Sequence, residues 1–154
     1  MRLTRRRNLP EGLTLDKGER VLAVSGDTVA TDAALHFQDG AGFTRLPWER
    51  VEQAVWKDGL LVVREVGGDR HTVHLTEPGS VPETVRERVT STVVVSTHVK
   101  LPGGGVRIAA RRPARGSGEP RWTLVFDPGL DPTDAGLLAQ AEQAMEELRR
   151  QTGL

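Results

Sequence analysis

The 154-residue sequence has no cysteine and no tyrosine, and only three lysines accompany its eighteen arginines. Without cysteine the chain can form neither a disulfide framework nor a thiolate metal site, and it has no cysteine nucleophile. No apolar run approaches the roughly 20 residues that a membrane-spanning helix needs, so we expect no integral membrane association. The lack of cysteine and of an apolar signal-peptide core predicts a cytoplasmic protein.

Arginine outnumbers lysine to a degree that is typical of bacterial genomes of high GC content, so we expect a bacterial source. The arginine content alone is therefore weak evidence for function. The chain is long enough for one hydrophobic core. We predict a frayed basic leader over residues 1–10 and a single α+β domain over residues 11–154.

The net charge is zero, but it is unevenly distributed. Residues 100–121 hold six basic side chains and one acidic side chain, a net charge of +5. The segments on either side are acidic overall. A basic hairpin on a neutral protein is therefore the main electrostatic feature of the sequence.

Short apolar runs separated by glycine and aspartate predict a meander of antiparallel strands in the first half of the chain. Pro47 should interrupt one run, because proline cannot donate to a strand ladder. Asp58 and Gly59 favour a two-residue hairpin turn. The predicted strand segments are residues 20–26, 28–37, 41–59 with the interruption, 60–66 and 70–76.

Over residues 80–89 the apolar residues recur at helical spacing and no longer alternate, which predicts a short helix. Ser80 and Glu83 have the spacing of a capping box, and the valines at 81, 85 and 89 recur on one face. Three further strands follow at residues 92–101, 105–112 and 120–126.

A C-terminal helix is predicted over residues 132–151, with Asp131 as its cap and Pro132 at its first position. Its apolar residues fall on one stripe at helical spacing, so it should cover an opening of the sheet. We expect one core cluster that joins this helix to both halves of the chain: Leu35, Phe37, Trp122, Leu124, Phe126, Leu138, Met145 and Leu148.

Two segments, "VATDAALHF" at 29–37 and "LPWERVEQAVW" at 46–56, resemble the early strands of bacterial pleckstrin-homology-like domains. The chain is also similar to an uncharacterised family from high-GC bacteria. The resemblance implies a strongly bent antiparallel sheet, or partly open barrel, of roughly six to eight strands, with a short inserted helix and a C-terminal capping helix. Lipid-binding members of the superfamily place a basic cluster at the first hairpin. The turn over residues 25–28 carries no cation here.

The histidines at 36, 71, 74 and 98 do not have metal-ligand spacing. His71 and His74 stand an odd number of residues apart in a predicted strand and should lie on opposite faces. No serine lies in a G-x-S-x-G turn. We therefore expect neither a metal site, nor a cofactor, nor catalytic activity.

The basic hairpin over residues 105–122 is the one candidate site. If its strands pair, Arg107, Arg111 and Arg121 lie on one surface with Arg112 near its tip. Such a surface could bind the phosphates of nucleic acid or another anionic surface. The alternative is a solvated face whose arginines pair with Asp127, Glu119 or the acidic helix, and we favour it.

The sequence as a whole indicates a non-catalytic interaction module whose partner is another protein, bound through a sheet edge or the groove beside the C-terminal helix. Binding of nucleic acid or an anionic surface through the arginine hairpin is the alternative. A small-molecule pocket in the sheet is a third reading that the sequence leaves open.

Overall fold

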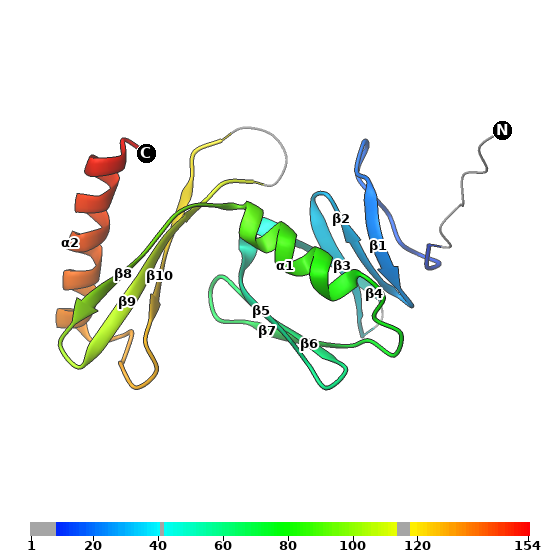
Figure 1. The fold of residues 1–154 in the computed structure, drawn as a ribbon, viewed down its shortest axis with the longest axis horizontal. Helices are drawn as coiled ribbons and strands as arrows, with labels where there is room; N and C mark the ends of the chain where they lie inside the picture. Colours follow the sequence, from blue (N-terminus) through cyan, green and yellow to red (C-terminus); the bar gives the residue numbers. More distant parts are fainter. Residues whose placement is uncertain (1–8, 41, 114–117) are drawn as a thin grey trace. The chain divides into compact units, whose positions relative to one another are not determined.

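A computed structural model of the chain describes residues 9–40, 42–113 and 118–154. These residues form ten strands, two α-helices and one short 3₁₀ helix (Figure 1). The predicted α+β class is confirmed. The contacts divide the chain into two compact units, Met1–Ser91 and Thr92–Leu154, which are described separately. Most of the predicted basic leader over residues 1–10 lies outside the described residues.

The first unit begins with a four-stranded antiparallel sheet in the order β1-β2-β3-β4. A two-residue turn joins the first two strands, and Gly26 supplies the positive φ of 55° that this turn needs. The middle of the sheet is buried on both faces, since Val29, Ala30 and Leu35 are each 0 % exposed. The strands are β1 (Val21–Ser25), β2 (Thr28–Thr31), β3 (Ala34–Asp39) and β4 (Gly42–Pro47).

Pro47 ends β4, as predicted, and the 3₁₀ helix Trp48–Arg50 leads to a second antiparallel sheet. This sheet has the order β5-β6-β7, with β5 at Val51–Lys57, β6 at Leu60–Glu65 and β7 at Arg70–His74. The predicted hairpin turn at Asp58 and Gly59 is confirmed by their φ angles of 53° and 77°. Trp48 is fully buried, and its indole N–H donates to the Thr31 carbonyl at 2.8 Å.

Helix α1 (Val81–Ser91) confirms the predicted inserted helix and packs against β1, β2 and β5. Val81 and Val85 are 0 % and 1 % exposed, so the valine stripe is the packed face. The Ser80 carbonyl accepts the N–H of Thr84, but no side-chain hydrogen bond joins Ser80 to Glu83 among the described residues. The helix begins where predicted without the predicted capping box.

The second unit is a three-stranded antiparallel sheet with one helix on one face. Its strands have the order β10-β9-β8, with β8 at Val93–Leu101, β9 at Gly104–Arg111 and β10 at Arg121–Phe126. Helix α2 spans Ala135–Thr152. The core of the unit joins Val106 and Ile108 of the sheet to Ala141 of the helix, all 0 % exposed.

Helix α2 starts later than the sequence predicted. Its N-cap is Asp134, whose carboxylate accepts the N–H of Leu137 at 3.0 Å. Asp131 instead accepts the backbone N–H and hydroxyl of Thr133, which forms a turn ahead of the helix. The predicted cap at Asp131 and the predicted first position at Pro132 are therefore wrong, because the nearer aspartate satisfies the helix terminus.

The predicted core cluster is confirmed in part, within the second unit. Leu35 and Phe37 belong to the first unit, whereas Trp122, Leu124 and the helix residues pack in the second. Leu138 is half-buried and lies outside that cluster. The strands form three sheets of four, three and three strands in place of the one bent sheet predicted. The pleckstrin-homology-like fold and the number of domains stay predictions.

Neither α1 nor α2, the helices in the described ranges, has the length and apolar character that crossing a membrane requires.

Candidate functional site

The arginine hairpin forms with the predicted pairing, because Arg121 lies opposite Arg111 and Val125 lies opposite Arg107. Its cations differ in accessibility. Arg107, Arg112 and Arg121 are exposed, whereas Arg111 is only 8 % exposed and donates to the Thr92 hydroxyl at 3.2 Å. One of the four predicted site residues is therefore held within the fold.

Asp127, one of the carboxylates expected to neutralise this hairpin, has another partner. Asp127 accepts from His98 Nε2, with its two oxygens at 2.9 and 3.1 Å. Arg107 donates to the Ser96 hydroxyl at 3.2 Å. In the described ranges no carboxylate forms an ion pair with Arg107 or Arg121, so their predicted acidic partners are wrong. Nucleic-acid binding through the hairpin stays a prediction.

Three histidines each contact a carboxylate. The sequence did not predict these contacts. The pairs join residues far apart in the sequence or on neighbouring strands, so spacing along the chain gives no signal for them. The contacts are His36 Nε2 to Glu19 at 2.7 Å, His71 Nε2 to Glu65 at 3.3 Å and His98 Nε2 to Asp127 at 2.9 Å. Where the structure describes the chain, no three His, Asp or Glu side chains gather closely enough to hold a metal ion.

The Glu19 carboxylate is the centre of a buried polar network in the first unit. Its side chain is 0 % exposed, and one oxygen accepts from both His36 and the Thr31 hydroxyl. The other oxygen accepts the backbone N–H of Asp16 at 3.0 Å and lies 3.8 Å from Arg45. The network ties the segment before β1 to strands β2, β3 and β4.

Burial alone raises the pKa of the Glu19 carboxyl, since it disfavours the charged form. The hydrogen bonds from His36, Thr31 and the Asp16 amide, together with the charge of His36, outweigh that effect and lower the pKa below its ordinary value. Because solvent does not reach Glu19, this ionised group stabilises the fold and is not placed to act on a substrate.

Strand β5 is one edge of the second sheet, because β6 is its one partner among the described strands. The backbone direction of β6 can be read from Glu65, whose N–H donates to Asp69 on the β7 side. Successive residues of a strand point their backbone groups to opposite edges. Val62, three residues before Glu65, therefore directs its backbone groups to β5, where it pairs with Val55.

The same alternation turns the backbone groups of Ala54 and Trp56 away from β6. No backbone hydrogen bond joins either residue to another segment in the part of the chain that is described. Both residues line a cavity of about 400 Å³ between β5 and helix α1. The opposite side of the groove comes from the first turns of α1, including Pro82 and Val85.

The hairpin that carries this edge has unusual apolar exposure. Val55, Trp56 and Leu60 are 45 %, 38 % and 38 % exposed. Three consecutive apolar residues at 54–56, followed by a tight turn, were visible in the sequence as a strand. Their position at an unpaired edge depends on the order of the sheet, which the sequence did not give.

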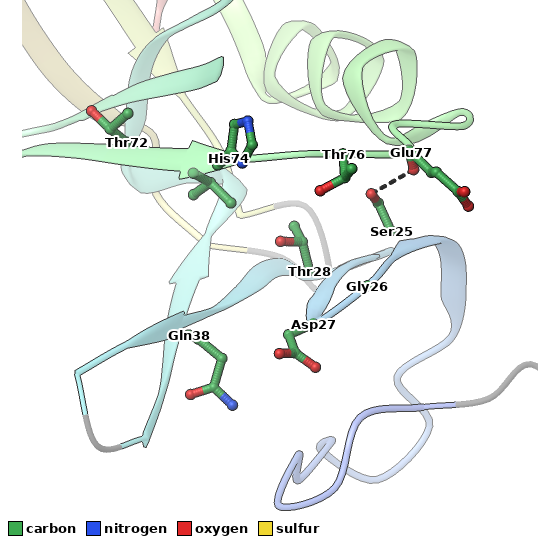
Figure 2. A pocket seen from close by; sticks show the side chains of 10 residues that line it. Ser25, Gly26, Asp27, Thr28, Gln38, Thr72, His74, Thr76 and Glu77 are labelled. Atoms are coloured by element: carbon green, nitrogen blue, oxygen red, sulfur yellow. Dashed lines mark hydrogen bonds between the residues drawn. The ribbon is translucent and has the colours of Figure 1, made fainter. Parts of the chain in front are cut away.

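A second cavity, of about 530 Å³, lies between the β1–β2 hairpin and strand β7 (Figure 2). The Ser25 hydroxyl closes one side of it by donating to the Glu77 carbonyl at 2.7 Å. The remaining wall is rich in hydroxyl and carboxylate groups.

No protein-family model, no curated protein and no solved structure matches this chain.

Proposed function

We propose that the protein is a non-catalytic binding module that takes up an extended segment of another protein along the edge of strand β5. The observation that carries the proposal is the outward-facing backbone of Ala54 and Trp56 beside the apolar groove. An extended peptide offers the matching N–H and C=O groups and becomes an added strand of the sheet.

The side chains around the edge support an apolar segment as the occupant. Trp56 is half-exposed and lines the groove, and Pro82 and Val85 line its other side. Exposed tryptophan is enriched among the residues that dominate binding energy at protein interfaces. Glu83 and Arg86 at the groove carry opposite charges, so the groove has no net charge to favour a nucleic acid.

An unpaired edge with apolar side chains is a liability that natural proteins blunt with charges, prolines or bulges. The Ala54–Trp56 segment has none of these, although a bulge lies earlier in β5, between Val51 and Gln53. A ligand strand is a physical reason to keep the segment open.

The test begins with a phage-displayed library of random dodecapeptides, selected against the whole protein. The affinity of an enriched peptide is then measured by fluorescence anisotropy. Ala54→Pro removes one outward N–H without touching the β5–β6 ladder, so it should weaken binding at least tenfold, or about 1.4 kcal/mol. Trp56→Glu should weaken it by a similar factor. Both variants should keep the circular dichroism spectrum of the parent.

The matched control is Thr72→Pro, on the other edge of the same sheet. Thr72 is exposed, and its backbone faces away from β6 by the same alternation, so this variant should bind normally. Apolar docking should also survive a several-fold rise in salt, whereas phosphate contacts would not. Peptides that bind Ala54→Pro as tightly as the parent would contradict the proposal.

A further inference from the structure

The cavity between the β1–β2 hairpin and β7 has the dimensions of a ligand site. Its volume of about 530 Å³ falls within the range of small-molecule pockets. Its walls come from three segments of the first unit: the hairpin with Asp27 and Thr28, the end of β3 with Gln38, and β7 with the two residues that follow Leu75. The site shares no lining residue with the β5 groove.

Thr28 is the feature that points to a ligand. The residue is 4 % exposed, lines the cavity and extends from β2 toward β7 (Figure 2). Its hydroxyl forms no hydrogen bond with any described residue, in contrast to Ser25, which donates to Glu77. The hydroxyl oxygen keeps accessible surface, although the residue as a whole is buried. The hydroxyl is thus free for a group that enters the cavity.

The charge of the lining selects the ligand class. Two carboxylates, Asp27 and Glu77, line the cavity, and no lysine or arginine of the described residues does. Neither carboxylate forms an ion pair within the described residues. They stand on separate segments, Asp27 on the β1–β2 hairpin and Glu77 on the segment after β7 (Figure 2). Such a lining repels phosphates and carboxylates and attracts cations.

A metal ion does not fit this arrangement. A metal needs several ligands around one point, and no group of three ligating side chains occurs among the residues described. Two separated carboxylates suit a longer cation whose positive charges are also separated. Val73 offers an apolar surface for the carbon chain between the charges.

We propose that this cavity binds a small organic cation with two or more ammonium groups, of the diamine or polyamine class. One ammonium group pairs with Asp27 and another with Glu77, while the Thr28 hydroxyl accepts an N–H between them. The imidazole of His74 and the amide of Gln38 complete a wall of hydrogen-bonding groups.

The probe for the test is spermidine, titrated into the full-length protein by isothermal calorimetry. It should bind at one saturable site. The double variant Asp27→Asn plus Glu77→Gln should weaken binding at least tenfold, since it removes both charges from exposed positions. Thr28→Val keeps the shape of the side chain, and it should weaken binding several-fold.

The matched control is Asp69→Asn, an exposed carboxylate of the same unit that lies outside the cavity. Its affinity for spermidine should equal that of the parent. Equimolar magnesium chloride should not displace spermidine, and neither inorganic phosphate nor glucose should bind. The proposal is overturned if spermidine does not bind, if it binds the double variant or Thr28→Val as tightly as the parent, or if magnesium displaces it.

Discussion

Replacing Glu19 with alanine removes the carboxylate that accepts hydrogen bonds from the Asp16 amide, Thr31 and His36. The variant therefore breaks the buried network that joins the segment before β1 to strands β2, β3 and β4. The carboxylate is 0 % exposed and His36, its partner at 2.7 Å, is 2 % exposed. Removing one member of such a buried pair costs about 3–5 kcal/mol, because the other member is left without compensation. Glu19→Ala should therefore lose that much of the free energy of unfolding.

Glu19→Gln removes the charge of the side chain but keeps its shape. The amide keeps one acceptor oxygen and gains a donor, so one of the two positions held by the carboxylate oxygens no longer accepts the hydrogen bonds made there. Hydrogen bonds to a charged group contribute about 1.5–3 kcal/mol, and the glutamine variant should lose an amount in this range. Asp16→Ala is the control, since Asp16 is 66 % exposed and its ion pair with Arg45 should contribute less than about 1 kcal/mol.

The stability that Glu19 contributes should decrease as the pH falls. A glutamate carboxyl in the unfolded chain titrates near pKa 4.5, and the pKa of Glu19 in the fold is lower. The unfolded state therefore binds the proton first as the pH falls. The stability that Glu19 contributes is complete above pH 4.5 and is lost as the pH falls through the pKa of the folded state. The difference in the free energy of unfolding between the parent and Glu19→Gln should therefore shrink as the pH falls through this range.

Urea denaturation measures both effects, followed through the NMR signal of the Trp48 indole N–H. That group donates to the Thr31 carbonyl, so it reports directly on the strand that the network holds. Two results would refute the reasoning. One is a loss below about half a kcal/mol for Glu19→Ala, far under the cost of breaking a buried pair. The other is a stability difference that does not change from neutral pH to pH values below the pKa of Glu19.

Two further stability predictions concern the second unit. Asp134→Ala should cost about 1 kcal/mol in thermal unfolding, because it removes the cap of α2. Asp131→Ala should cost less, and equal costs would argue against Asp134 as the cap. Gly105→Ala should cost about 1–3 kcal/mol, since the added Cβ would lie 2.4 Å from the His98 ring. Gly104→Ala should cost less because the nearest atom to the added Cβ, in the Leu130 side chain, would lie 3.2 Å away, and a larger loss there would contradict the assignment.

The order of the strands and helices could be predicted because short stretches of sequence determine where each one begins or ends. The turn at Asp58 and Gly59, the break at Pro47 and the valine stripe of α1 each depend on a few neighbouring residues. The start of α2 was missed by three residues because two aspartates at 131 and 134 both suit a cap. Only the folded geometry shows that the first one bonds Thr133 instead.

The division into sheets could not be read from the sequence. Apolar alternation identifies strands but does not say which strand pairs with which. The end of β4 at Pro47 separates the meander into two sheets, and this separation turns β5 into an edge. The sequence therefore predicted only that Trp56 lies within a strand. Its role at the proposed peptide site depends on a pairing that is absent on one side.

Gly105 illustrates how such pairing creates contacts that spacing cannot reveal. The run of three glycines at 103–105 reads as a flexible turn, but Gly105 lies within β9, between β8 and β10. It faces Lys100 on one side, and its carbonyl accepts the N–H of Asp127 on the other. Because Gly105 has no side chain, the His98 ring can cross β9 and reach Asp127, 29 residues away in the sequence. Asp127 therefore pairs with a histidine of β8 and not with the arginines of the hairpin. The glycine thus determines which partner Asp127 has in this sheet.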